Sequence, residues 1–317
     1  MRILFWGTPE FAVPPLQALL GEGFDVIGVV TQPDRPVGRA RLLTPPPVKV
    51  VALREGLPVL QPEKPRGDAF MAELTALGPD LNVVVAYGHI LPTAVIEQPP
   101  RGTINIHASL LPALRGAAPI ETAVRRGVTE TGVTIMRMVL AMDAGPILHA
   151  SRAPILPDET GGELRNRLSE LGAQSLIEAL ALMELDQLPE VAQDASLVTF
   201  APKIEREDAR IDWTAPAPDV ANVIRAYDPR PGAYTTQHGV DVKCFGARAS
   251  HMLTHVDRPG TVIAVDDDGM MVACGEGTVR ISDVHPSGKR RQSVREWAAG
   301  RGVAINDVFG GGPVRAE

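Results

Sequence analysis

Apolar residues in the first two hundred positions gather in two kinds of run. Short runs rich in β-branched residues are typical of buried strands, and longer runs repeat their apolar residues at helical spacing. We expect strands at residues 2–6, 25–31, 58–60, 81–86, 104–107, 130–139 and 146–154. We expect helices at residues 9–21, 47–56, 66–77, 118–127 and 161–186. Strands that alternate with helices in this way predict an α/β domain with a mostly parallel sheet.

The character of the sequence changes after Asp194. Residues 203–212 are highly charged and are followed by Trp213 and a Pro/Ala stretch, which is typical of a linker. Short strand-like runs then alternate with turn residues: AYTT, VDVKCF, GTVIAV, GMMVAC and GTVRISDV. This pattern predicts a small all-β barrel or sandwich. We therefore expect domains at 1–202 and 213–317, joined by a linker at 203–212.

The composition fits two globular domains. The chain has 317 residues, of which 44% are hydrophobic and 22% charged, and this length is large for a single core. No apolar run approaches the roughly 20 residues that a membrane span needs, and the start, MRILFWGTPEF, is expected to be a strand and not a secretion signal. Cys244 and Cys274 lack metal-ligand spacing, so we expect reduced, buried thiols in a cytoplasmic protein.

Charge is distributed unevenly along the chain. The net charge of −7 disfavours indiscriminate binding to nucleic acid. Residues 35–54 nevertheless hold five basic residues and no acidic ones. The loop that begins this segment, QPDRPVGRARLLTPPPVKV, is rich in Pro and Gly, and we expect about a dozen of its residues to lack regular structure. It is either a solvated surface loop or a contact for a selective anionic partner.

The turn after the first strand disfavours a nicotinamide-dependent oxidoreductase. It contains a single glycine, Gly7, and so lacks the GxGxxG dinucleotide fingerprint. Thr31-Gln32-Pro33 closes the second strand, where that fold would need an acidic residue for the ribose.

Asn105 and His107 lie at the end of the strand expected at 104–107. Side chains two residues apart on a strand point to the same face, here at the edge of the sheet where open α/β folds bind ligands. The amide can donate to a developing oxyanion, and the imidazole can move a proton. Asp143, from another strand end, would fix the histidine tautomer. The alternative is a lone histidine that caps a core strand.

No serine or cysteine is placed as a nucleophile. Ser109 lies in an S-L-L-P turn and not in the G-x-S-x-G turn of hydrolases. This favours direct acyl transfer between two bound substrates over a covalent acyl-enzyme.

Several motifs give the chain a specific resemblance: INIHASLLPALRGAAPI, ETGVTIM with Asp143 in an MDAG turn, FWGTPEFAV, VVTQPDRPVGR, VVVAYGHILP and ARIDW. In these motifs the chain resembles the 10-formyltetrahydrofolate-dependent formyltransferase family over nearly its whole length. The resemblance implies a Rossmann-like N-terminal domain with a mostly parallel sheet and a C-terminal β-barrel of OB-fold type. It implies transfer of a formyl group from 10-formyltetrahydrofolate to the α-amine of initiator methionyl-tRNA, and nothing in it calls for a metal.

The resemblance also assigns roles to single positions. It implies three catalytic residues: Asn105, His107 and Asp143. It implies folate contacts from one turn and one loop: Ser109, Leu110, Leu111 and Pro112, and Tyr87, Gly88, His89, Ile90 and Leu91. It implies that the basic loop meets the tRNA acceptor stem, with Arg39 foremost, and that Lys203 lies near the tRNA end. From charge, we expect phosphate contacts by Arg35, Arg39, Arg41, Lys289, Arg290 and Arg291.

Two other functions remain open. A formyltransferase of this family could act on a small amine, such as a purine precursor or an amino-sugar nucleotide, but segment 35–54 and the second domain argue against it. A non-catalytic RNA-binding protein could keep the same scaffold, but the intact Asn105, His107 and Asp143 argue against that. The chain departs from the family pattern at Ala113-Leu114, at Asp143-Ala144-Gly145 and at Arg230.

Overall fold

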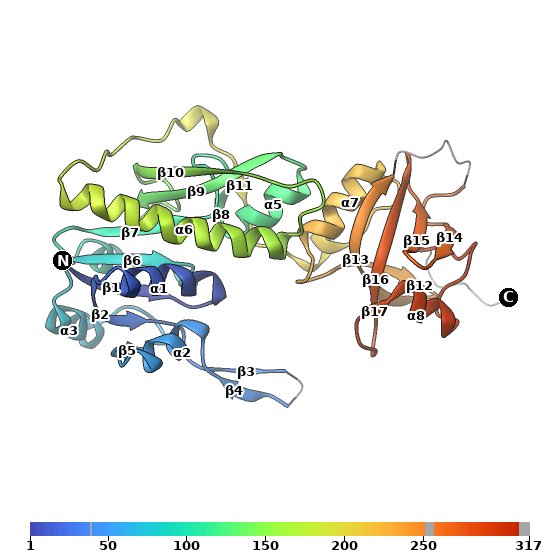
Figure 1. The fold of residues 1–317 in the computed structure, drawn as a ribbon. Coiled ribbons are helices and arrows are strands. Elements are labelled where there is room, and N and C mark those ends of the chain that lie inside the picture. Colours follow the sequence, from blue (N-terminus) through green and yellow to red (C-terminus); the bar gives the residue numbers. More distant parts are fainter. Residues whose placement is uncertain (39, 251–256, 311–317) are drawn as a thin grey trace. The chain divides into compact units, whose positions relative to one another are not determined.

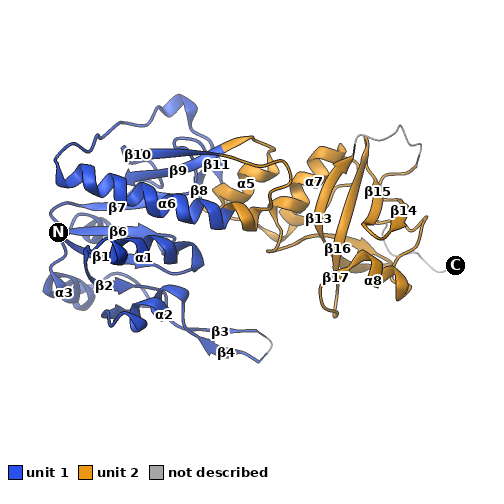
Figure 2. Cartoon of the chain, viewed as in Figure 1, with its two compact units in different colours: residues 1–116, 131–153, 165–201 blue, residues 117–130, 154–164, 202–317 orange. Residues whose placement is uncertain are grey.

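The computed structural model describes residues 1–38, 40–250 and 257–310, and the chain forms two compact units (Figure 2). Unit 1 comprises residues 1–116, 131–153 and 165–201, and unit 2 comprises residues 117–130, 154–164 and 202–317. Two short segments from before residue 165 therefore pack within unit 2, which contains the whole C-terminal region.

Unit 1 is built on a seven-stranded sheet with the strand order β10-β9-β7-β6-β1-β2-β5 (Figure 1). The strands are β1 (Arg2–Gly7), β2 (Asp25–Val30), β5 (Val59–Leu60), β6 (Leu81–Val85), β7 (Thr103–His107), β9 (Glu130–Arg137) and β10 (Ile147–Pro154). The five strands from β5 to β7 in this order are parallel, whereas β9 runs antiparallel to β7. The predicted α/β domain with a mostly parallel sheet is confirmed.

Most helices of unit 1 lie where the sequence pattern places them: η1 (Glu10–Ala12), α1 (Val13–Gly21), α2 (Pro47–Arg54), α3 (Asp68–Leu77) and α6 (Gly161–Glu184). The short helix α4 (Thr93–Ile96) is not among the predicted helices. Helix α6 buries Leu164 and Leu168 completely, as its apolar spacing predicts. At Gly172 it approaches the sheet closely, because a Cβ there would lie 3.1 Å from the Ile106 side chain of β7. The long helix thus braces the strand that carries Asn105 and His107.

The basic loop contains regular structure, so the prediction of an irregular segment is wrong. Strands β3 (Arg35–Val37) and β4 (Leu42–Thr44) pair as an antiparallel hairpin, in which Pro36 lies opposite Leu43. Proline is compatible with an edge strand, where its missing N–H is not needed. Gly38 and Arg41 reverse the chain with φ angles of +73° and +48°.

Unit 2 contains a six-stranded antiparallel sheet along the path β12-β13-β16-β15-β14, with β17 paired to β16. Its strands are β12 (Ala233–Gln237), β13 (Val240–Ser250), β14 (Val262–Asp266), β15 (Gly269–Ala273), β16 (Thr278–Pro286) and β17 (Gln292–Ser293). The expected C-terminal antiparallel β domain is confirmed, and its OB-fold type stays a prediction.

Of the helices of unit 2, the sequence pattern predicts only α5 (Pro119–Arg125). It misses η3 (Arg206–Ala209), α7 (Ala217–Ala226) and α8 (Val294–Ala299). Prolines around the start of α7 gave that stretch the appearance of a linker, although proline is well tolerated in the first turn of a helix. Its apolar face buries Val220, Ala221 and Ile224. In the segment expected as a linker, Ala209 and Ile211 are also buried.

The structure also bears on the two cysteines, on metal sites and on membrane-spanning helices. Cys244 and Cys274 are buried free thiols, and burial raises the pKa of each to about 12. Within the described part of the chain, no three His, Cys, Asp or Glu side chains cluster so that they could hold a metal ion. Among the same residues, no helix has the length and apolar character needed to cross a membrane.

Candidate active site

Asn105 and His107 lie on one face of β7, as strand alternation predicts. His107 is 6% exposed and ends the strand, and Asn105 is partly exposed. The amide of Asn105 makes no hydrogen bond to any residue that the structure describes. A partly exposed amide with unused N–H groups can donate to a bound carbonyl oxygen.

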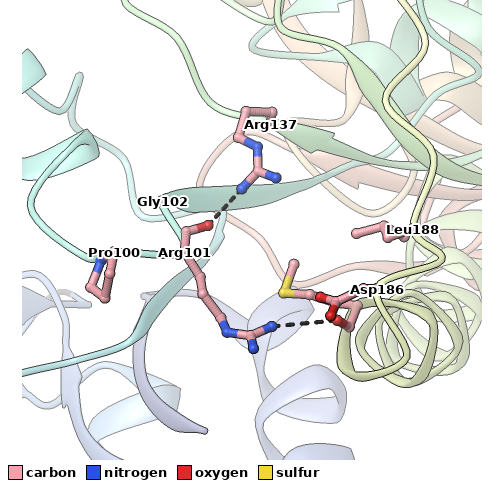
Figure 3. Close-up of a pocket in the computed structure, with 7 residues that line it drawn as sticks. Pro100, Arg101, Gly102, Arg137, Asp186 and Leu188 are labelled. Carbon is pink, nitrogen blue, oxygen red and sulfur yellow. Dashed lines mark hydrogen bonds between the residues drawn. The ribbon is translucent and has the colours of Figure 1, made fainter.

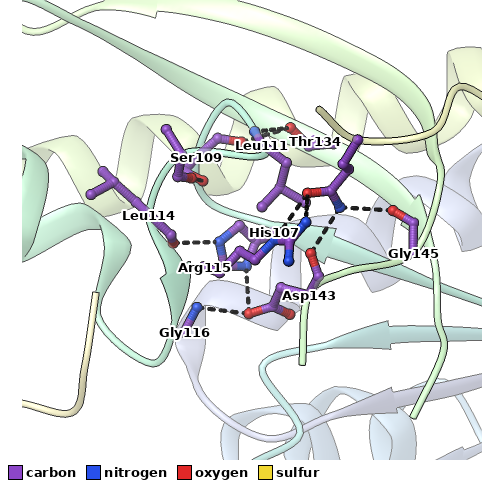
Figure 4. Close-up of polar contacts among 11 residues, drawn as sticks. His107, Ser109, Leu111, Leu114, Arg115, Gly116, Thr134, Asp143 and Gly145 are labelled. Atoms are coloured by element: carbon purple, nitrogen blue, oxygen red, sulfur yellow. Dashed lines mark hydrogen bonds and ion pairs between the residues drawn. The ribbon is translucent and has the colours of Figure 1, made fainter. Parts of the chain in front are cut away.

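Both ring nitrogens of His107 face protein groups (Figure 4). Nε2 lies 2.9 Å from the carbonyl oxygen of Leu114, and Nδ1 lies 3.7 Å from Oδ2 of Asp143. A carbonyl can only accept, so Nε2 carries a hydrogen and donates it. Nδ1 is therefore the nitrogen that can take a further proton, and the carboxylate beside it would stabilise the resulting imidazolium.

Asp143 is held by the backbone of a neighbouring segment. Its Oδ2 accepts a hydrogen bond of 2.8 Å from the N–H of Gly116, and its side chain is 15% exposed. Asp143 has a φ of +50° in a tight turn that ends at Gly145. Any Cβ at Gly145 would collide with the carbonyl of Arg137, so the turn requires glycine there. The tight turn of the MDAG motif thus sets the position of the Asp143 carboxylate.

The S-L-L-P turn is fixed by β9. Thr134 donates to the carbonyl of Ser109 at 2.7 Å and accepts from the N–H of Leu111 at 3.1 Å, and Ser109 donates to the Ala113 carbonyl at 2.6 Å. Ser109 and Leu111 are buried, whereas Leu110 and Pro112 are partly exposed. Of this predicted folate-contact turn, Leu110 and Pro112 therefore retain surface for a ligand.

The predicted folate-contact residues of the loop after β6 are also partly buried in the core and partly exposed. Tyr87 and Leu91 are buried in the core, where the Tyr87 ring packs edge-on against Trp6 at 5.2 Å. Gly88, His89 and Ile90 are exposed, and Nε2 of His89 lies 3.0 Å from Oε1 of Gln32. The exposed part of the loop is the part that can meet a ligand.

Two of the predicted tRNA contacts of the first half lie on the β3–β4 hairpin. Arg35 and Arg41 are exposed, and Arg39 lies outside the described residues. Three large apolar side chains are also exposed on the two strands, by 55% at Val37 and by 69% at both Leu42 and Leu43. The hairpin therefore presents basic and apolar side chains together.

The hairpin is anchored at its base by Asp34. This carboxylate accepts hydrogen bonds of 2.8 Å from Nζ of Lys49 and from Nε2 of Gln61. These bonds, with that from Gln61 the larger influence, lower the pKa of Asp34 from its ordinary value of 3.8. The anchor is therefore an ionised carboxylate near neutral pH.

The predicted basic residues of unit 2 differ from one another in the contacts that their side chains make. Lys203 is exposed. Arg291 lies 3.1 Å from the buried carboxylate of Asp228 and stacks over the Phe245 ring at 4.1 Å, which is a structural role. Arg290 lies 3.7 Å from Glu296. In the described part of the chain, the side chain of Lys289 makes no ion pair, so it is the member of its cluster most available to a phosphate.

A cavity of about 670 Å³ lies beside the start of β7, at the end opposite to His107 (Figure 3). Its lining is Pro100, Arg101, Gly102, Arg137, Met183, Asp186 and Leu188. Arg137 donates to the Arg101 carbonyl at 2.6 Å and pairs with Glu190, and Arg101 donates to the Met183 carbonyl at 3.3 Å. Both arginines therefore serve the protein's own structure, and we do not assign the chemistry to this cavity.

Sequence reasoning missed both partners that hold the His107–Asp143 pair. They are the carbonyl of Leu114 and the N–H of Gly116, in the segment that follows the S-L-L-P turn. Backbone atoms carry no signal in residue type. Gly116 gives one indirect sign, since its φ is +121° and a Cβ at this position would lie 2.5 Å from the Ala201 carbonyl oxygen, and both demand glycine.

Two family descriptions match the chain. A formyl transferase description matches residues 1–180, and a formyl transferase C-terminal domain description matches residues 203–302. Among curated relatives, the methionyl-tRNA formyltransferase of Geobacter metallireducens is 45% identical over 300 residues, which cover 95% of this chain and 96% of the relative. The methionyl-tRNA formyltransferase of Methylococcus capsulatus is 47% identical over 304 residues, which cover 96% of this chain and 98% of the relative.

Among solved structures, HypX from Aquifex aeolicus in complex with tetrahydrofolic acid is similar to this chain with a TM-score of 0.66. The match covers 93% of this chain and 46% of that one at 22% identity, and so it supports the fold alone.

Proposed function

The chain belongs to the formyl transferase family, and from this membership we propose that it formylates the α-amine of initiator methionyl-tRNA with 10-formyltetrahydrofolate as the donor. The proposal rests on the sequence identity to methionyl-tRNA formyltransferases and on how much of the chain that similarity covers. Identities of 45% and 47% to methionyl-tRNA formyltransferases extend over at least 95% of this chain, including its C-terminal β domain.

The residues at the end of β7 fit a formyl donor. The unused N–H groups of Asn105 would donate to the formyl oxygen as negative charge builds on it. The exposed residues Gly88, His89 and Ile90, with Leu110 and Pro112, would supply the surface for the folate. When bound, 10-formyltetrahydrofolate supplies an activated formyl group on nitrogen.

The acceptor amine needs alignment more than activation. An α-amine has a pKa of about 7.7–8.0, so a useful fraction is neutral near pH 7. Its nitrogen forms a bond to the formyl carbon, the bond from that carbon to N10 of the folate breaks, and one proton passes from the amine to N10. Nδ1 of His107 is the group that we expect to take and release this proton, with Asp143 stabilising the charged ring.

The β3–β4 hairpin is our candidate for the contact with the acceptor stem. Arg35 and Arg41, with Arg39 between them in sequence, would neutralise phosphates, and Leu42 and Leu43 would cover the apolar faces of bases at the end of the stem. Lys203 and Lys289 are exposed cations that can add phosphate contacts from the second unit. We expect the activity in the cytoplasm, where charged tRNA is found.

One assay separates this function from its alternatives. The protein is incubated with 10-formyltetrahydrofolate and, in parallel, with charged initiator methionyl-tRNA, a purine-precursor amine or an amino-sugar nucleotide. Formylated methionyl-tRNA supports the proposal. Product from a small amine alone would overturn the choice of acceptor, and binding of tRNA without any product would favour a non-catalytic RNA-binding protein.

A further inference from the structure

Residues 193–201, here called the strap, contact both the 114–116 segment and the turn that presents Asp143. The strap contains a short 3₁₀ turn, η2 (Ala195–Leu197), and ends in β11 (Phe200–Ala201), which pairs in parallel with β8 (Arg115–Gly116). Nothing in the periodicity of the sequence marks it, because most of its side chains are exposed.

The amide of Gln193 has all of its hydrogen-bonding capacity in use. Its Nε2 donates to the carbonyls of Asp143 and Gly145, at 2.8 and 2.7 Å. Its Oε1 accepts from Nε and Nη2 of Arg115, at 3.0 and 2.7 Å. An amide offers two donors and two acceptor sites, so this one is saturated. Gln193 therefore ties the turn that presents Asp143 to the segment that holds its carboxylate.

Thr199 holds the other partner of the histidine. Its Oγ1 accepts from the N–H of Leu114 at 2.9 Å, and its carbonyl accepts from the N–H of Arg115 at 2.9 Å. Leu114 has a φ of +61°, an uncommon conformation for leucine, and its carbonyl is the group that accepts from Nε2 of His107. The Leu114 carbonyl and the Arg115 N–H belong to one peptide group, which the Thr199 carbonyl holds, while the Thr199 hydroxyl holds the peptide group before it. Thr199 thus fixes the backbone on both sides of the Leu114 Cα.

The bend between these two residues is built into the strap. Oδ1 of Asp194 accepts from the N–H and the hydroxyl of Ser196, at 2.9 and 2.7 Å, which caps the 3₁₀ turn. The capped turn lies between Gln193, which contacts the Asp143 turn, and Thr199, which contacts Leu114.

We propose that Gln193 is a positioning residue for Asp143, and that Thr199 is its counterpart for the Leu114 carbonyl, so that the strap sets the orientation of His107 from both sides. This inference rests on the proposed formyl transfer, because positioning is expressed only in that reaction. Neither side chain touches the reacting atoms in this proposal.

The decisive variants are Gln193→Glu and Gln193→Ala. Glutamate keeps the size and the pairing with Arg115 but cannot donate to the two carbonyls, so it separates the clamp on Asp143 from simple packing. We expect both variants to lower the single-turnover rate of methionyl-tRNA formylation by about 10- to 100-fold, since a displacement of about 1 Å can cost about 100-fold. The KM for each substrate and the melting temperature should stay near those of the wild type.

Gln187→Ala is the matched control, because Gln187 is exposed on the segment between α6 and the strap. Thr199→Val, which keeps the shape and removes the acceptor, should give a smaller loss of the same kind. A Gln193→Glu variant with wild-type rate would overturn the proposal, as would a rate loss fully explained by a lowered melting temperature. A wild-type protein without formylation would instead refute the proposed function.

Discussion

Nδ1 of His107 and Oδ2 of Asp143 lie 3.7 Å apart, although the two residues do not come from matching strand ends. Strand β9 runs antiparallel to β7, so its last residue, Arg137, pairs with Ile104 near the beginning of β7. The turn after β9 then returns Asp143 to the other end of β7, where Gly116 receives its carboxylate. The pair is thus assembled by a loop and a backbone N–H, and its geometry depends on both.

The first prediction concerns Asn105, the proposed oxyanion donor. Asn105→Asp keeps the shape of the side chain and replaces its N–H donors with acceptors. We expect the single-turnover formylation rate to fall by about 100- to 1,000-fold, which is the usual effect of removing such a donor. Folate binding measured by fluorescence should change little, and a variant with normal rate would remove Asn105 from the catalytic set.

The second prediction concerns the hairpin. Arg35→Ala and Arg41→Ala should each weaken binding of methionyl-tRNA and lower the slope of log affinity against log salt by about 1, because each removes one phosphate contact. Filter binding over a series of salt concentrations measures this slope. Arg54→Ala is the control, since Arg54 is exposed on α2 and pairs with Glu55 at 2.9 Å. If Arg35→Ala and Arg41→Ala keep the slope of the wild type, as the Arg54→Ala control should, the hairpin does not touch the tRNA.

The third prediction tests the role of Tyr87. Its hydroxyl has no hydrogen-bond partner among the described residues, and burial raises its pKa to about 12. An unpartnered buried hydroxyl costs about 1–3 kcal/mol, so Tyr87→Phe should keep or increase the free energy of unfolding in urea. The KM for 10-formyltetrahydrofolate should not change. A raised KM would instead assign the hydroxyl a direct contact with the folate.

The fourth prediction is a pH dependence at the base of the hairpin. The pKa of Asp34 is lower in the folded protein than its ordinary 3.8, so the folded state binds its proton less readily than the unfolded state. The stabilisation is complete above that ordinary value and is lost as the pH falls through the lowered one. Thermal melts of the wild type should therefore fall more steeply with acidification below about pH 4 than those of Asp34→Asn. Parallel curves would contradict the anchor.

Much of unit 1 could be predicted because burial and periodicity coincide there. The apolar run of β6 and the leucines of α6 are buried as their spacing indicates, and the pair Asn105 and His107 follows from strand alternation. Helix α7 was missed because proline near a helix start resembles proline in a linker. The hairpin was missed because its strands are short and exposed, so no burial pattern marks them.

The candidate active site was predictable only in its side chains. Asn105, His107 and Asp143 stand out by chemical type, whereas the groups that orient them are the Leu114 carbonyl and the Gly116 N–H. The contact between Gln193 and the Asp143 turn joins segments far apart in sequence, and a glutamine in an exposed stretch has many possible roles. Such contacts follow from the path of the chain and not from local pattern.

The exposed apolar residues of the β3–β4 hairpin have a calorimetric consequence. Val37, Leu42 and Leu43 leave apolar surface in water that a bound acceptor stem would cover. Burial of apolar surface lowers the heat capacity, so association with tRNA should show a negative heat-capacity change in addition to its salt dependence. Contacts between arginines and phosphates alone would not produce that signature.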